Sequence, residues 1–470
     1  MQPAPPSVTP GRGALRGAFA VLLLAFIAAV VGAQPPAPAA AQPKPEDRKD
    51  EPKKEPPEPK WPTEINGKSI GHVLKDLKDP DPVNREQAAR TLPSFGPAAR
   101  KEAVSKVLVE RMVAERDPGV RFAVYSAIGS ITFESERDNT EALRILNGVI
   151  DTAASGSSSR YQAVQTVYLF GNRAEGSIVT LIGVAASDAS YETRRTIASA
   201  LGRISFNDKT GPNMKALTAL ADRFAKDECA AVRMEALQAL LLLGPPWAGV
   251  RKPDDKMPPP IEEKSAATIV KYMKARVGDP ATKPKPTPGL EKDKQVEIWA
   301  RLVLMRFDPK EINDDNLNAF AACLTGTDLG VRVQALQAMG LMGEAAGKRV
   351  DAVAGLLTDK DQPLPLTLAT VQTLAAMGAG AKPAVPKLKE FGGEIKKVVD
   401  QIKNDERKMA LALIQLKDKE KKDAEDALKI KENDRKTGEE IIKLIEEVVK
   451  HIETAKPAIT GGSPGDPKKP

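Results

Sequence analysis

Histidine, cysteine and aromatic residues are scarce in this sequence. Only two histidines and two cysteines occur among 470 residues, and 4% of the residues are aromatic. The histidines, His72 and His451, lie near opposite ends of the chain, which argues against a histidine-based metal or acid/base site within one subunit. Ala, Val and Leu are abundant instead, which favours a thin helical array with small interdigitating side chains over one large core.

Catalytic motifs are also missing. The sequence has no glycine-rich phosphate loop, no HExxH, CxxC or GxSxG motif and no calcium-loop spacing. The carboxylate pairs Asp254-Asp255 and Asp314-Asp315 lie in loop sequence, where solvated charges are far more common than an acid/base couple. We therefore predict no enzymatic activity, no catalytic residue, no metal ligand and no cofactor. The net charge of +7 is a weak excess of 70 basic over 63 acidic residues, and does not indicate nucleic acid.

What the sequence does contain is an internal repeat. It is clearest in TDLGVRVQALQAMGLMG, residues 327–343, and returns with near-constant spacing apart from one longer step. A mostly small residue follows three positions after the aligned residue and a large apolar one follows after seven, which predicts one helical stripe per repeat. The aligned residues, here termed the reference positions, are Arg85, Arg121, Arg160, Arg194, Arg233, Glu297, Arg332 and Thr367.

Each repeat also carries signals for the start and end of its helix. Asp81, Asp117 and Asp328 lie four residues before a reference position, where a carboxylate caps a helix and can reach the arginine. Eleven residues after a reference position the helix is expected to end. A residue in the left-handed conformation commonly ends a helix, and glycine adopts that conformation most easily. The glycines found there are Gly96, Gly171, Gly244, Gly343 and Gly378.

This DxxxR…A…L…G pattern resembles HEAT repeats and the lyase-type HEAT-like repeats over residues 61–392. The resemblance implies an all-α, armadillo-like solenoid, a superhelix of about eight helical hairpins, with residues 61–77 supplying the first outer helix. The lyase-type relatives act on a bilin chromophore, so an enzyme remains an alternative, although no catalytic motif is matched. Tetratricopeptide and ankyrin arrays have similar periods, but their signature residues are absent.

The N-terminus reads as an export signal. Arg12 and Arg16 precede an uncharged apolar run that closes on Val31-Gly32-Ala33, so residues 1–33 are predicted to be a cleaved signal peptide. The alternative is an uncleaved inner-membrane anchor, although the run is shorter than the ~20 residues of a spanning helix. Residues 34–60 are rich in proline and balanced charge, which predicts a disordered linker. The expected location is periplasmic or extracellular.

The remaining segments interrupt or follow the repeats. Two proline-rich insertions are expected at about 245–260 and 278–292. Residues 393–455 carry a heptad-like stripe with one defective position, Glu406, followed by a capping-box pattern at Thr437 and Glu440 that predicts a second helix start. The helices are expected to form a charged hairpin, or to pair between chains as a coiled coil. Residues 456–470 should be a disordered tail.

The two cysteines are predicted to be free, buried thiols. Cys229 precedes the repeat helix of the fifth unit, and Cys323 ends the outer helix of the seventh. Adjacent repeats already differ in position by about one helix diameter, ~10 Å, whereas a disulfide tolerates a Cα separation of only ~7 Å.

The predicted partner surface lies on the repeat helices. Positions two and five residues after each reference position point away from the apolar stripe. They include Ala123, Trp299, Leu302 and Ala369, and only Arg90 among them is basic, whereas phosphate binding needs many cations. We therefore predict a protein or peptide partner and no nucleic acid. The competing interpretation is that glutamine merely favours exposed helix. The proposed partner-binding residues are Gln87, Gln162, Gln165, Gln238, Gln334, Gln337 and Gln372.

Together these patterns predict an exported, non-enzymatic scaffold for protein–protein interaction. The alternatives are a lyase-type HEAT-like enzyme and a nucleic-acid-binding solenoid. Contact with a membrane is expected only through residues 1–33, if they remain attached.

Overall fold

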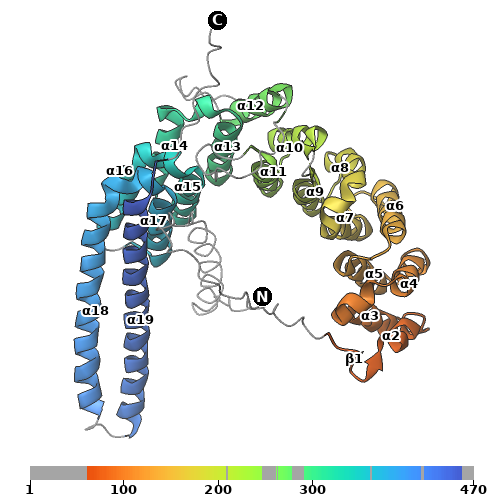
Figure 1. Cartoon of the computed structure of the whole chain (residues 1–470), viewed down its shortest axis with the longest axis horizontal. Coiled ribbons are helices and arrows are strands. Elements are labelled where there is room, and N and C mark those ends of the chain that lie inside the picture. The colour runs from red at the N-terminus through yellow and green to blue at the C-terminus, as the bar shows by residue number, and fades with distance from the viewer. Residues whose placement is uncertain are drawn as a thin grey trace, which may run out of the picture. The chain divides into compact units, whose positions relative to one another are not determined.

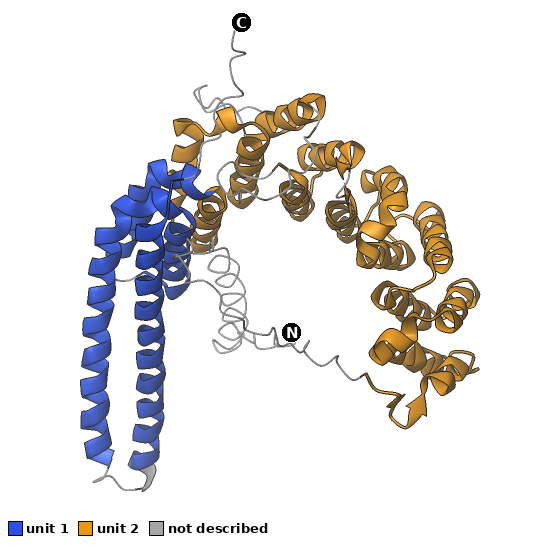
Figure 2. Ribbon diagram, in the orientation of Figure 1, with its two compact units in different colours: residues 1–55, 252–254, 343–470 blue, residues 56–251, 255–342 orange. Residues whose placement is uncertain are grey.

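The computed structural model describes residues 61–207, 210–245, 261, 263–277, 290–359, 362–413 and 418–457. The chain divides into two compact units (Figure 2): unit 2 comprises residues 56–251 and 255–342, and unit 1 comprises residues 1–55, 252–254 and 343–470. The predicted signal peptide and linker, most of the two insertions and most of the tail lie outside the described residues. None of the described helices is long and apolar enough to cross a membrane.

Unit 2 is an α-solenoid of helical hairpins arranged in two rows (Figure 1). Each of the first seven reference positions lies in a helix of the inner row, and successive inner helices pack against each other. The inner row is α3 (Pro82–Thr91), α5 (Pro118–Ile131), α7 (Ser158–Phe170), α9 (Tyr191–Ile204), α11 (Ala230–Leu243), α13 (Lys294–Phe307) and α15 (Leu329–Met342). The outer row is α2 (Ile70–Asp76), α4 (Glu102–Ala114), α6 (Glu136–Thr152), α8 (Ile178–Ala185), α10 (Met214–Lys226), α12 (Glu263–Val277) and α14 (Asp314–Leu324).

The predicted apolar stripe forms the core. The residues seven positions after the reference positions are at most 1% exposed in all eight repeats, because this stripe faces the neighbouring helices. The predicted all-α solenoid is therefore confirmed. The core residues of this stripe are Leu92, Ile128, Val167, Leu201, Leu240, Leu304, Met339 and Leu374.

The predicted helix caps are present, but they do not bind the reference arginines. Asp81, Asp117 and Asp328 each accept a backbone N–H from the first turn of the helix that follows. The expectation that these carboxylates also reach the arginine is wrong. Arg85 instead extends to the next repeat and donates to Glu115, with an Nε–Oε2 distance of 2.8 Å, because the capping carboxylate is already engaged by backbone amides.

Buried ion pairs link successive repeats into what we term the arginine ladder. Its arginines occupy reference positions, and each carboxylate lies six residues before the next reference position, with a side chain at most 2% exposed. All four arginines also donate to a backbone carbonyl of the loop before their own helix. Each rung therefore joins two loops and one helix. The rungs are Arg85–Glu115, Arg160–Asp188, Arg194–Asp227 and Arg233–Glu291, with N–O distances of 2.7 or 2.8 Å.

The arginine ladder has two gaps within unit 2. Ala154 occupies the carboxylate position that would face Arg121, and the Nε of Arg121 is buried without a hydrogen-bond partner. At the second gap the reference residue is Glu297 and the position facing it is Gly326. Glu297 pairs instead with Arg301 of its own helix, at 2.9 Å. Both gaps therefore result from a change of residue type at a ladder position.

The first rung predicts a pH-dependent contribution to stability. The hydrogen bond from Arg85, reinforced by the backbone N–H of Asp117 and the charge of Arg111, lowers the pKa of Glu115 from 4.5 to about 2. A carboxyl whose folded pKa is depressed stabilises the fold above its unfolded pKa and loses that contribution as the pH falls toward the folded pKa. We expect Glu115→Gln to be less stable than the wild type at about pH 6, and the gap to narrow between pH 4.5 and about 2.

Urea unfolding followed by circular dichroism at several pH values measures this gap. Because every other carboxylate is common to both proteins, the difference between their midpoints isolates Glu115. A gap that stayed constant over that pH range would show that the carboxylate charge does not stabilise the rung.

Glycine ends four of the five predicted helices in the expected left-handed conformation, with φ between 53° and 60°. Gly244 is the exception, since its φ is −69°. A Cβ there would lie 3.0 Å from the carbonyl oxygen of Leu240 and 3.0 Å from the ring of Phe307, so glycine is favoured at this position by the limited space and not by its backbone conformation. The left-handed glycines are Gly96, Gly171, Gly343 and Gly378.

The first outer helix is shorter than predicted. A β-hairpin precedes α2, formed by β1 (Glu64–Ile65) and β2 (Lys68–Ser69). Its two-residue turn is Asn66-Gly67, and both residues have positive φ, 52° and 73°. Asn-Gly is the strongest short-range signal for such a turn. The prediction of a helix over residues 61–77 gave more weight to the helical spacing of the apolar residues. Further short elements are β3 (Phe206–Asn207), β4 (Gly211–Pro212), η1 (Leu92–Arg100), η2 (Gly171–Ser177) and η3 (Pro309–Glu311).

Unit 1 contains the eighth repeat helix and a long helical hairpin. The expected boundary between residues 392 and 393 lies inside α18, which continues from the repeat into the hairpin, and α18 packs against α19 of the same chain (Figure 1). The elements are η4 (Gly343–Arg349), α16 (Val350–Gly355), η5 (Leu356–Thr358), α17 (Leu364–Ala376), η6 (Gly378–Ala384), α18 (Val385–Leu413) and α19 (Asp418–Thr454).

The capping box predicted at Thr437 and Glu440 does not start a helix. Both residues lie inside α19, and the hydroxyl of Thr437 donates to the carbonyl of Asn433 one turn earlier, at 2.9 Å. Charged pairs such as Arg435 with Glu439, four residues apart, continue the helix through this segment. Arg435 also pairs with Glu406 across the hairpin at 3.0 Å, which explains how the stripe accommodates its defective position.

The cysteines are unpaired, as predicted, but neither is fully buried. Cys229 is the residue before α11 and Cys323 lies in the last turn of α14, and both are half-buried. The expectation of buried thiols is wrong because both residues lie at helix ends, where the loops between repeats leave side chains partly open to solvent. Partial burial still raises the pKa of the Cys323 thiol.

Candidate functional site

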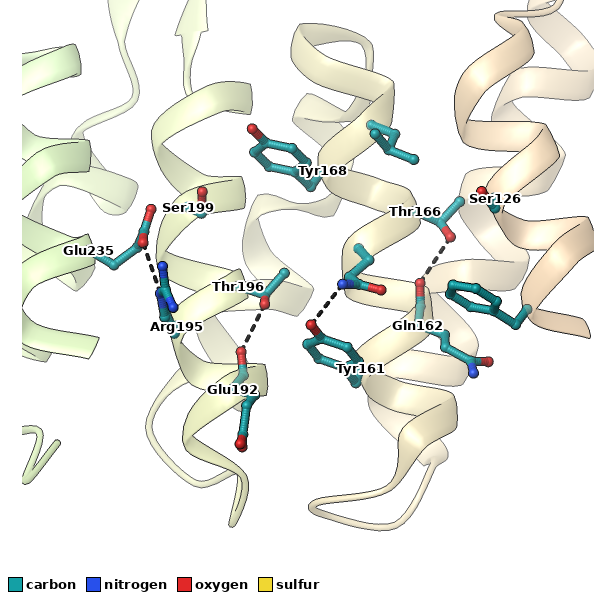
Figure 3. A pocket seen from close by; sticks show the side chains of 13 residues that line it. Ser126, Tyr161, Gln162, Thr166, Tyr168, Glu192, Arg195, Thr196, Ser199 and Glu235 are labelled. Carbon is teal, nitrogen blue, oxygen red and sulfur yellow. Dashed lines mark hydrogen bonds and ion pairs between the residues drawn. The ribbon is translucent and has the colours of Figure 1, made fainter. Parts of the chain in front are cut away.

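A groove crosses the inner helices α5, α7, α9 and α11 of unit 2 (Figure 3). It consists of two adjoining hollows of about 550 and 570 Å³, which share Tyr168, Ser199 and Glu235. The first hollow extends from α5 to α11, and the second covers the C-terminal ends of α9 and α11. We refer to both hollows together as the inner groove.

Several exposed apolar and aromatic side chains line the inner groove. Phe122 is 36% exposed, Leu169 38% and Leu242 71%, and Tyr161 and Tyr168 line the same groove. These residues are exposed because they lie next to, and not within, the apolar stripe of their helices. Aromatic and apolar side chains that face solvent in one hollow are typical of a surface that binds a partner.

Amide and hydroxyl groups supply the polar part of the inner groove. Gln162 and Gln165 project from α7, and the side-chain amide of Gln165 donates to the hydroxyl of Tyr161 at 2.7 Å (Figure 3). The hydroxyls of Thr166 and Thr196 instead donate to backbone carbonyls one turn earlier in their own helices. The glutamine amides are therefore the groove's main groups for hydrogen bonds to a ligand.

Charged groups in the inner groove are few, and two of them neutralise each other. Arg195 pairs with Glu235 of the next helix at 3.1 Å (Figure 3). The guanidinium of Arg203 stacks on the ring of Tyr168, 4.8 Å from its centroid. Backbone hydrogen bonding, together with a hydrogen bond from the hydroxyl of Ser190, lowers the pKa of Glu192.

Only some of the predicted glutamines meet in this groove. Gln162 and Gln165 line the first hollow and Gln238 lines the second. Gln334 accepts from the indole N–H of Trp299 at 2.7 Å and donates to a neighbouring glutamine side chain, so it links α13 to α15. The others lie outside the groove: Gln87 in α3, Gln337 in α15 and Gln372 in α17 of unit 1.

Three of the positions expected to point away from the core are buried. Ala123 is 1% exposed, Leu302 is fully buried and Ala369 is 8% exposed. In α5 and α13 the reason is that inner helices pack against inner helices on both sides, so that the buried arc of each helix is wider than a single stripe. Ala369 lies in α17, which packs instead against α16 and α19. The groove's aromatic residues were missed because the sequence interpretation considered only two positions per repeat.

A separate hollow of unit 2, about 670 Å³ and outside the inner groove, lies at the second gap of the arginine ladder. Glu297, Arg301, Cys323 and Gly326 line it, between α13 and the helices that follow. Its buried charges, Glu297 and Arg301, already pair with each other. In the part of the chain that the structure describes, no cluster of His, Cys, Asp and Glu has the arrangement of a metal site.

No family model and no curated protein matches this chain. Similar solved structures include one described as Kap95p binding to RanGDP, at 12% identity and a TM-score of 0.42, covering 81% of this chain and 49% of that chain. Another is importin beta in an ammonium sulfate condition, at 14% identity and a TM-score of 0.42, covering 82% of this chain and 48% of that chain. The present chain therefore spans about half the length of these two chains, and neither comparison identifies a partner for it.

Proposed function

We propose that this protein is an exported, non-enzymatic scaffold that holds a polypeptide partner in the inner groove. The observation that carries the proposal is the mixed lining of the groove, in which exposed or half-buried aromatic and aliphatic side chains of α5, α7 and α11 lie beside glutamine amides of α7 and α11. Tyr, Phe and other large side chains dominate the energetics of protein recognition, while amides bond to the donors and acceptors of a polypeptide backbone.

The charges of the groove favour polypeptide over nucleic acid. Phosphate backbones are bound mainly by several unpaired Lys or Arg side chains. Two arginines line the groove, and one of them, Arg195, is neutralised by Glu235. Glu192 adds a further negative charge to the same lining. Export rests on the sequence of residues 1–33, which lie outside the described part of the chain.

Selection of displayed random peptides on the purified full-length protein tests the proposal. We expect enriched peptides to bind the wild type in fluorescence anisotropy, and Tyr168→Ala to weaken them at least tenfold, because an aromatic side chain at the centre of an interface typically contributes about 2 kcal/mol or more. Tyr168 is the informative residue because it lines both hollows.

The matched control is Val179→Ala on α8 of the outer row, which truncates a side chain that is 68% exposed and does not belong to the groove lining. It should bind the selected peptides as tightly as the wild type does. The double variant Gln162→Ala, Gln165→Ala should bind them more weakly. If no peptide is enriched, or if Tyr168→Ala binds as the wild type does, the proposed function is wrong.

A further inference from the structure

Three successive inner helices place a leucine, an arginine and a leucine at equivalent positions of the inner groove. Leu169 of α7, Arg203 of α9 and Leu242 of α11 each lie nine residues after a reference position. All three line the groove. We term them the Leu-Arg-Leu row, and it offers one positive charge between two apolar contacts.

Arg203 is held in place without being neutralised. Its guanidinium stacks on Tyr168 at 4.8 Å from the ring centroid, and no carboxylate among the described residues forms an ion pair with it. Stacking restrains the side chain and leaves the outer edge of the guanidinium available for hydrogen bonds. Arg306, the equivalent residue of α13, differs because it is half-buried and donates to the carbonyl of Pro245 at 2.6 Å. The row therefore ends at α11.

The spacing of the row fits one backbone conformation. Packed helices lie about 8–10 Å apart, and a polyproline II helix advances about 9 Å in each turn of three residues. Residues i, i+3 and i+6 of such a peptide therefore point to the same side and meet three consecutive helices. In a β-strand, by contrast, residues three apart point to opposite sides.

The surroundings of the row favour the same conformation. A polyproline II peptide has no internal hydrogen bonds, so its backbone carbonyls are free to accept from groups such as the amides of Gln165 and Gln238. Such peptides also dock in grooves lined by aromatic residues, and Tyr168 and Phe206 line this one.

We propose that the inner groove binds a polyproline II peptide with apolar residues at i and i+6 and an acidic residue at i+3. This inference rests on the proposed function, because it names the partner's chemistry at the same groove. The two apolar residues contact Leu169 and Leu242, and the carboxylate pairs with Arg203.

The test compares two capped, fluorescein-labelled peptides, LPPEPPL and LPPKPPL, by fluorescence anisotropy with the full-length protein. The wild type should bind the glutamate peptide about fivefold more tightly, the effect of about 1 kcal/mol expected of one partly exposed ion pair. Arg203→Glu should reverse this preference, and Arg203→Gln should abolish it. Added salt should reduce the preference.

Arg144→Gln is the control, since this arginine lies on α6 of the outer row, is not part of the groove lining, and has a side chain that is 70% exposed. It should keep the preference for the glutamate peptide. Equal affinity of the wild type for the two peptides, or no measurable binding of either, overturns the inference. The proposed function fails separately, only if random selection yields no peptide that depends on Tyr168.

Discussion

Replacing Asp227 by asparagine is expected to lower the free energy of unfolding by about 3 kcal/mol. The carboxylate of Asp227 is 2% exposed and accepts two hydrogen bonds from Arg194, at 2.8 and 3.0 Å, and one from the backbone N–H of Cys229. Asparagine keeps the shape but removes the charge, which leaves a buried guanidinium uncompensated. The loss of one partner of a buried pair costs far more than the pair itself contributes.

The adjacent residue provides the control for this prediction. Glu228 lies 3.8 Å from the same arginine, but its side chain is 92% exposed. Glu228→Gln should therefore change stability by less than about 0.5 kcal/mol. Urea unfolding measures the overall loss, and hydrogen exchange should show it concentrated in α9 and α11. If the two variants were equally stable, burial would not be what makes the rung strong.

The second large effect is steric. A leucine at Gly202 of α9 is expected to cost about 2 kcal/mol, because even a Cβ there would lie 2.7 Å from the Cβ and 3.0 Å from the Cα of Ala239 in α11. The two helices would have to move apart beneath the inner groove. We therefore expect the Gly202→Leu protein to lose affinity for groove-binding peptides as well as stability.

The same substitution at Gly183 should have the opposite sign. This glycine lies in α8, and a Cβ there would meet nothing within 4 Å. Leucine would then gain roughly 0.8 kcal/mol from its higher helix propensity. Thermal and urea unfolding of both variants decide the matter. A loss of stability at both positions would mean that leucine itself, and not the close approach of α9 to α11, is responsible.

The repeat helices could be predicted from the sequence because one stripe recurs at near-constant spacing. The spacing of Arg194, Ile197 and Leu201, for example, predicts a helix and the face of it that is buried. The turn at Asn66-Gly67 and the continuity of α19 were not predicted. At Asn66-Gly67 the apolar spacing of residues 61–77 favoured a helix over a turn. At Thr437 and Glu440 a sequence typical of a helix start occurs inside a helix that charged pairs continue.

The arginines of the ladder could be recognised in the sequence as reference positions, but they were expected to contact the capping aspartates of their own repeats. Asp117, four residues before its reference position, caps the helix, whereas Glu115, six residues before it, pairs with the arginine of the preceding repeat. Sequence spacing gives distances along one helix, but this pair is formed between repeats. The residues of the inner groove were predicted only in part, because contacts between helices cannot be read from spacing along one helix. Gln162 and Gln165 follow from one helix, whereas the stacking of Arg203 on Tyr168 depends on how two helices meet.

Because the arginine ladder has gaps, we expect the stiffness of unit 2 to vary along its length. Three consecutive rungs brace the segment from α7 to α13, and the junctions at Ala154 and Gly326 on either side have none. In a chain held together only by neighbour-to-neighbour contacts, bending and local opening concentrate where those contacts are weakest. The Leu-Arg-Leu row spans α7 to α11 and so lies on the braced segment, whereas Phe122 of α5 contributes to the groove across a junction that has no rung. We therefore expect the distance between Leu169 and Leu242 to vary less in solution than the distance between α5 and α7.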